Sequence, residues 1–104
     1  MNSKLKTPAV EMLFKAVLSL KNIDECYEFF EDICTINELL SLSQRFEVAK
    51  MLREHKTYLD IAENTGASTA TISRVNRSLN YGNDGYDKVF ERLSLLDKEE
   101  NGQA

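Results

Sequence analysis

The chain has 104 residues, of which 42% are apolar and 29% are charged, and its formal net charge at pH 7 is −4. This is the size and balance of one ordinary globular domain, and four glycines with one proline exclude a collagen-like or Pro/Gly-rich disordered chain. No apolar run reaches the ~20 residues that span a bilayer, and the N-terminus lacks a secretory signal pattern. We therefore predict one cytoplasmic domain over residues 1–104 that does not associate with membranes.

Cysteine and histidine offer little for catalysis or metal binding. Cys26 and Cys34 share an expected helix, whose rise puts them roughly 12 Å apart and beyond disulfide reach. His55 has no partner at zinc-ligand spacing, and the chain has no Cys-x-x-Cys pair, phosphate-binding glycine loop or nucleophile–base arrangement. We predict that the protein is not an enzyme and binds neither a metal nor a cofactor.

Helical spacing dominates the chain and predicts an all-α fold of about six helices. The first helix begins at Pro8, which suits a first turn, and its apolar residues recur at i, i+3, i+4 and i+7. The second begins at Asn22 or Asp24. Thr35 and Glu38 then form a capping-box pattern, which predicts a third helix over about 36–54.

The second half of the chain predicts three shorter helices separated by clear breaks. Thr57 opens a helix that stops at Gly66, a natural left-handed C-terminal residue. Ser68 caps the next helix, over about 69–79. After a turn-rich segment, Asp84 can cap a last helix over about 86–96, and we expect the polar tail 98–104 to fray.

The first three helices carry more large apolar residues than a small monomer can cover. Leftover apolar surface of this kind favours a dimer. The residues concerned are Val10, Leu13, Phe14, Val17, Leu18, Ile23, Phe29, Phe30, Ile33, Ile36, Leu39, Leu40 and Phe46.

Charge is segregated along the chain. Residues 1–21 carry a net +3, residues 22–38 carry −6, residues 45–79 carry +2 and residues 80–104 carry −3. Residues 66–79 contain two arginines, many hydroxyl groups and no acidic residue. This segment is therefore the place to look for binding to an anionic partner.

Residues 57–79, TYLDIAENTGASTATISRVNRSL, predict a helix-turn-helix. Ala62 supplies the small side chain needed where two helices cross steeply, and Gly66 supplies the positive φ of the turn. Three apolar residues form the inner faces of the crossing: Ile61, Ile72 and Val75.

With these residues inward, the remaining side chains of the second helix point toward a DNA major groove, flanked by the residues before the first helix. The candidate DNA-binding residues are Lys56, Thr57, Ser68, Thr69, Ala70, Thr71, Ser73, Arg74 and Arg77.

Two adjoining segments, CTINELLSLSQRFEVAKMLREHKTYLDIAENTGA and ASTATISRVNRSL, resemble the Trp repressor superfamily. The resemblance runs from about Leu18 to Leu79 and is greatest to the Trp-repressor-like YerC/YecD branch of Firmicutes, which the following NYGNDGY segment also fits. It implies an all-α fold of six helices, an intertwined two-fold dimer and a helix-turn-helix that reaches DNA.

The resemblance also implies an effector pocket, because the Trp repressor binds L-tryptophan as a corepressor. Arg74 matches the arginine that pairs with the amino-acid carboxylate, and Thr35 matches a threonine of the loop before the third helix. The arginine that stacks on the indole falls near Gln44 or Arg45. Val75 replaces a family glycine, and its β-branched side chain would fill space that an indole needs. We therefore expect a small effector other than tryptophan, or none.

The leading interpretation is a sequence-specific DNA-binding transcriptional regulator, a repressor, acting as a homodimer. Its two recognition helices would enter successive major grooves ~34 Å apart and read a palindromic operator. The alternative is a protein-interaction module with a degenerate helix-turn-helix, which the acidic segment 22–38 and the net negative charge favour.

Overall fold

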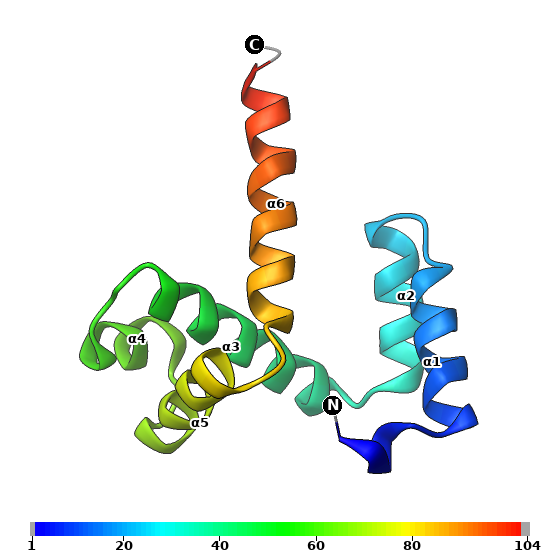
Figure 1. Cartoon of the computed structure of the whole chain (residues 1–104), viewed down its shortest axis with the longest axis horizontal. Coiled ribbons are helices and arrows are strands. Elements are labelled where there is room, and N and C mark those ends of the chain that lie inside the picture. Colours follow the sequence, from blue (N-terminus) through cyan, green and yellow to red (C-terminus); the bar gives the residue numbers. More distant parts are fainter. Residues whose placement is uncertain (1, 103–104) are drawn as a thin grey trace. The chain divides into compact units, whose positions relative to one another are not determined.

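The computed structural model describes the backbone of residues 2–102 and the side chains of residues 2–94 (Figure 1). Every regular element of this part is helical, so the predicted all-α class is confirmed. A short 3-10 helix that we did not predict comes first. The elements are η1 (Ser3–Leu5), α1 (Pro8–Leu18), α2 (Ile23–Ile33), α3 (Ile36–Arg53), α4 (Tyr58–Thr65), α5 (Thr69–Tyr81) and α6 (Gly85–Gly102).

Contacts divide the chain into two compact units, residues 1–40 and residues 41–104. In the N-terminal unit, α1 and α2 run in opposite directions (Figure 1) and both begin at side-chain caps. Thr7 accepts a hydrogen bond from the Val10 amide at 3.1 Å, and Asn22 accepts one from the Glu25 amide at 2.9 Å. Asn22 is therefore the cap of α2, which the sequence left open between two residues.

No side chain of residues 2–40 is buried. Large apolar side chains of this unit are instead widely exposed: Leu18 is 83% exposed, Ile36 80% and Ile23 70%. The predicted surplus of apolar surface on the first helices is therefore present in the single chain.

The predicted capping box at the start of α3 is confirmed. The Glu38 amide donates to Thr35 Oγ1 at 3.1 Å, and the Thr35 amide donates to Glu38 Oε1 at 2.9 Å. The hydrogen bonds from Thr35 lower the pKa of the Glu38 carboxyl, because they favour its charged form.

The C-terminal unit contains the hydrophobic core, which joins α3, α4 and α5. Ile61 and Ile72 are fully buried and Val75 is 3% exposed, as the helix-turn-helix prediction required. Aromatic rings from α3 and α6 cover one side, with the centroids of Phe46 and Phe90 5.2 Å apart. Among the side chains of residues 2–94, the buried ones are Val48, Ala49, Met51, Ile61, Ala67, Ile72, Val75 and Leu79.

The last helix differs from its prediction at both ends. Its backbone runs from Gly85 to Gly102, so the segment from Lys98 to Gly102, which we expected to fray, continues the helix; residues 103–104 lie outside the described part. Asp84 has a φ of 61°, in the left-handed region, whereas a side-chain cap is extended. Its carbonyl, rather than its side chain, starts the helix by accepting from the Lys88 amide at 3.1 Å.

None of the described helices is long and apolar enough to cross a membrane.

Candidate nucleic-acid interface

The helices α4 and α5 form the predicted helix-turn-helix, and Figure 1 shows them together near the C-terminal end of α3. Gly66 ends α4 with a φ of 71°, and its amide donates to the Ala62 carbonyl at 2.9 Å. Ala67 follows in the turn and is only 5% exposed. The turn is therefore held from both sides, by a left-handed glycine and by a buried alanine that sequence reasoning missed.

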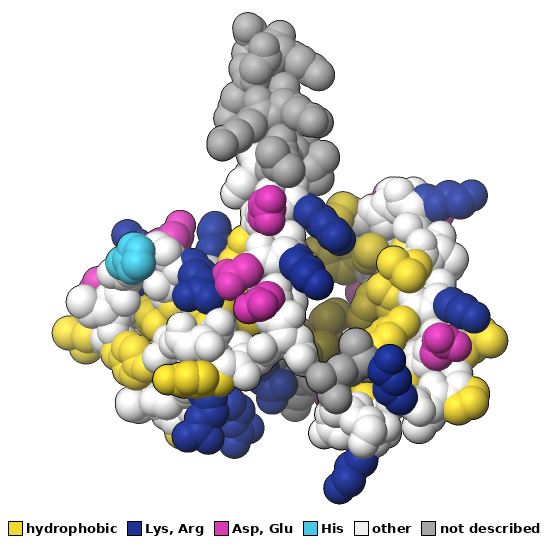
Figure 2. Space-filling model, viewed as in Figure 1, with side chains coloured by type: hydrophobic (Ala, Val, Ile, Leu, Met, Phe, Trp, Pro, Cys, Tyr) yellow, Lys and Arg dark blue, Asp and Glu magenta, His cyan; other side chains and the backbone are white. Residues whose placement is uncertain are grey.

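The outer side of α5 presents the residues that we predicted to face DNA. Arg74 and Arg77 are exposed, and they are the only basic residues of this helix, which has no acidic residue. Figure 2 shows Lys and Arg side chains gathered below the position of α5 on the displayed face. Among the nine candidates Thr71 is half-buried, and the others are exposed: Lys56, Thr57, Ser68, Thr69, Ala70, Ser73, Arg74 and Arg77.

The hydroxyl groups of this surface have local tasks. Thr57 caps α4 by accepting from the Asp60 amide at 3.1 Å. Ser68 caps α5 by accepting from the Thr71 amide at 3.1 Å, and it donates its own proton to Thr71 Oγ1 at 3.1 Å. The Ser68 side chain is therefore engaged in capping the N-terminus of α5. The amides of Thr69 and Ala70 in the first turn stay available to an anion.

The link between α3 and α4 is a tight turn that leads into the helix-turn-helix. The His55 amide donates to the Leu52 carbonyl at 3.0 Å, and the Lys56 amide donates to the Met51 carbonyl at 3.1 Å. His55 itself has a φ of 62°. This tight reversal holds Lys56 exposed immediately before α4, beside the Thr57 cap.

A small cavity is lined by residues of α3, α5 and α6, and it brings together most of the predicted effector-pocket residues. Its volume is about 170 Å³. Gln44, Arg45, Arg74 and Val75 all line it, whereas Thr35 serves as the cap of α3. The Gln44 amide nitrogen also donates to the Thr65 carbonyl at 3.0 Å, which ties α3 to the end of α4.

Four further lining residues, Ser41, Thr71, Ser78 and Tyr86, were absent from the predicted pocket. Ser78 carried a usable signal, since it lies one helical turn after Arg74 on the same face of α5. Tyr86 carried none, because its approach depends on how the turn between α5 and α6 folds.

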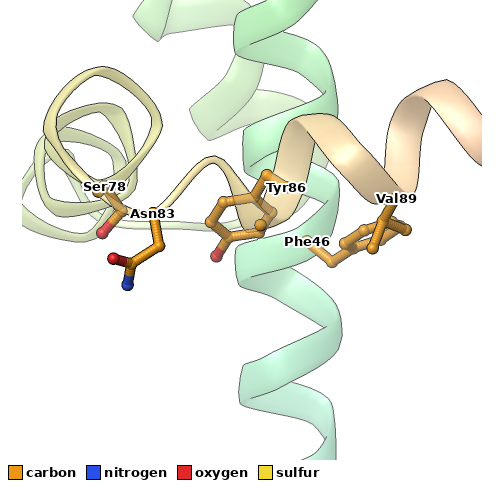
Figure 3. Close-up of a pocket in the computed structure, with 7 residues that line it drawn as sticks. Phe46, Ser78, Asn83, Tyr86 and Val89 are labelled. Atoms are coloured by element: carbon orange, nitrogen blue, oxygen red, sulfur yellow. The ribbon is translucent and has the colours of Figure 1, made fainter. Parts of the chain in front are cut away.

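A second, more apolar cavity of about 460 Å³ shares Ser78 and Tyr86 with the first. Figure 3 shows Phe46 and Val89 together at one end, Ser78 and Asn83 at the other, and Tyr86 between them. Tyr86 therefore forms a wall common to both cavities.

Comparison with known proteins matches residues 9–94 to the family described as Trp repressor protein. The chain is 54% identical over 100 residues to the uncharacterized protein YerC of Bacillus subtilis (strain 168), covering 96% of both sequences.

Two solved structures share the fold. A TrpR-like protein from Eubacterium eligens ATCC 27750 is 84% identical, with a TM-score of 0.88 over 89% of this chain and 96% of that one. A candidate Trp repressor from Staphylococcus aureus is 53% identical, with a TM-score of 0.86 over 88% of this chain and 92% of that one. The chain therefore belongs to the Trp repressor family, whose members are DNA-binding regulators rather than enzymes.

Proposed function

We propose that the protein is a sequence-specific transcriptional repressor that binds a palindromic DNA operator as a homodimer in the cytoplasm. The observation that carries the proposal is the outer face of α5, where Arg74 and Arg77 are exposed on a helix without acidic residues. This helix sits on a buried crossing of Ile61 and Ile72, so it presents those side chains from a rigid support. Arginine is well suited to guanine edges and to phosphates.

The homodimer is supported by the burial pattern of the N-terminal unit. A unit in which no described side chain is buried has little apolar burial to offset the conformational entropy lost on folding. A second copy would cover exposed apolar side chains such as those of Leu18, Ile23 and Ile36. Two recognition helices related by a two-fold axis then explain why the operator should be palindromic.

The effector, where the repressor uses one, is a small molecule other than tryptophan. Val75 is almost fully buried, and the adjoining cavity of about 170 Å³ is smaller than the ~300 Å³ at which drug-sized ligand pockets begin. Arg45 and Arg74 line this cavity with positive charge, which favours an anionic group on the effector. Gln44 lines the same cavity, and Thr35 stays a candidate effector residue by family resemblance alone.

The decisive experiment is capture of genomic DNA fragments by the purified protein at two salt concentrations, with and without L-tryptophan. We expect enrichment of a palindromic site that survives the higher salt and does not require tryptophan. Uniform recovery of fragments that disappears at higher salt would indicate phosphate attraction alone and would refute sequence-specific binding. A protein partner recovered through residues 22–38 in that case would support the interaction-module alternative, which their net charge of −6 favours.

Arg77→Ala tests the base-reading role on the captured site. We expect a loss of ~1–3 kcal/mol in binding free energy and relaxed discrimination at one base pair, measured by fluorescence anisotropy on operator variants. Arg92→Ala removes the same exposed charge from α6 and is the matched control. An equal loss on operator and random DNA would show instead that Arg77 contacts only the backbone.

A further inference from the structure

Three hydrogen bonds from one guanidinium connect the end of α3 to α5 and to α6. Arg53 Nε donates to Asp87 Oδ1 at 2.8 Å, and Arg53 Nη2 donates to Asp87 Oδ2 at 2.9 Å. The same Nη2 also donates to the Leu79 carbonyl at 3.1 Å. The Asp87 carboxylate therefore binds the guanidinium through two parallel hydrogen bonds, and Nη2 of the same guanidinium also reaches the recognition helix.

The Leu79 carbonyl belongs to the last turn of α5, where carbonyl groups lack partners within the helix. The end of α5 also lacks a basic residue of its own to interact favourably with the negative end of the helix dipole. Arg53 supplies both the missing donor and the missing positive charge from a neighbouring helix. The pKa of Asp87 is lowered by its hydrogen bond to Arg53, so the pair is charged at neutral pH.

We infer that Arg53 is a positioning residue for the recognition helix, which its contacts with Asp87 and the Leu79 carbonyl hold in the orientation that DNA docking requires. The inference rests on the proposed DNA-binding function. The turn at Gly66 and the buried Ile72 hold the N-terminal half of α5. The C-terminal half, in which Arg77 lies, is held by the buried Leu79 side chain and by the Arg53 contact.

Because the Arg53–Asp87 contact is exposed, its effect on the orientation of α5 can be distinguished from its effect on the stability of the fold. The side chains of Arg53 and Asp87 are 40% and 42% exposed, and exposed ion pairs contribute little to folding. The buried side chain of Leu79 keeps α5 attached to the core whether or not the contact is present. Loss of the contact should therefore change the orientation of α5 far more than the stability of the fold.

Lysine cannot replace arginine in this arrangement. A lysine ammonium carries the same charge but not the planar fork, so it cannot engage both Asp87 oxygens and the Leu79 carbonyl in the same geometry. Arg53→Lys therefore removes the positioning contact while leaving the net charge of the protein unchanged.

The test compares Arg53→Lys, Asp87→Asn and the double variant with wild type on operator and random DNA. We expect each single variant to lose roughly tenfold in operator affinity, with random-DNA affinity and Tm nearly unchanged for Arg53→Lys. The double variant should lose no more than either single one, because both act through one contact. Arg92→Lys, the same exchange at an exposed position of α6, is the control and should match wild type.

Amide hydrogen exchange of the same variants provides a second readout that does not depend on DNA. We expect faster exchange in the last turn of α5 and unchanged exchange around Ile72. Unchanged operator affinity and unchanged exchange in Arg53→Lys would overturn the positioning role. Wild-type protein that binds no specific site would instead refute the proposed function, and the exchange data would still report whether Arg53 holds α5.

Discussion

Gly82 lies between α5 and α6, and its replacement by alanine tests the backbone geometry of this turn. A Cβ built on Gly82 would lie well within 3.0 Å of the Ser78 carbonyl oxygen and 3.3 Å from the carbonyl carbon. Both atoms are backbone of the last turn of α5, so neither can rotate away as a side chain would. Gly82→Ala must therefore displace that turn and strain the 3.0 Å hydrogen bond from the Gly82 amide to the Ser78 carbonyl.

The expected cost follows from these contacts. Replacing glycine by alanine gains ~0.4–1 kcal/mol by restricting the unfolded chain. Overpacking against a fixed neighbour costs ~1–3 kcal/mol, and weakening one hydrogen bond costs about 1 kcal/mol. We therefore expect Gly82→Ala to lower the free energy of unfolding by about 1–3 kcal/mol.

Gly85 is the matched control, because a Cβ there meets nothing within 4 Å and the residue starts a helix. Gly85→Ala should be neutral or stabilise the protein by up to ~1 kcal/mol. Urea unfolding at one fixed protein concentration would give both free energies, since any dimer makes stability depend on concentration. Equal stability of the two variants, or a larger loss in Gly85→Ala, would refute the clash.

Three further predictions test the core, a cap and the response to acid. Ile72→Ala, at a fully buried site, should cost ~2–5 kcal/mol in urea unfolding, whereas Leu59→Ala, at a site 69% exposed, should change stability by less than ~0.5 kcal/mol. Ser68→Ala removes the cap of α5 and should cost ~1 kcal/mol, measured in the same assay. The pKa values of Glu38 and Asp87 are lowered from the ordinary 4.5 and 3.8, so the stabilisation from these carboxylates is present above those ordinary values and is lost as the pH falls through the folded pKa. A urea midpoint that does not decrease as the pH is lowered through the folded pKa values would contradict this.

Local signals in the sequence predicted the helix starts well. Thr35 with Glu38, Thr57 and Ser68 each cap the helix that the pattern assigned to them, because a cap depends only on a few neighbouring residues. The left-handed Gly66 was predictable for the same reason. The burial of the helix-turn-helix crossing followed from apolar spacing alone.

Features that depend on residues distant in the chain could not be predicted. Asp84 is a separate, local case: it looked like a helix cap, but the turn before α6 places it in the left-handed region. Arg53 looked like one of several basic residues on α3, and its partner Asp87 becomes its neighbour only after α6 packs against α3. Tyr86 likewise joins the 170 Å³ cavity of Arg45 and Arg74 only once α6 is in place.

The charge pattern explains how an acidic protein can recognise DNA. Its surface charges act over about 8–10 Å at physiological salt, so the acidic segment 22–38 matters to a phosphate only where it comes within that range. The outer face of α5 offers a phosphate Arg74 and Arg77 on a helix that carries no acid. Nonspecific affinity for DNA comes from counterion release at many phosphates, whereas specificity comes from contacts with base edges. A protein that attracts DNA weakly as a whole but contacts it strongly at one face therefore favours specific over nonspecific binding. On the proposed function, operator affinity depends on the orientation of α5, so we expect a contact as exposed as that of Arg53 with Asp87 to matter more for binding than for folding.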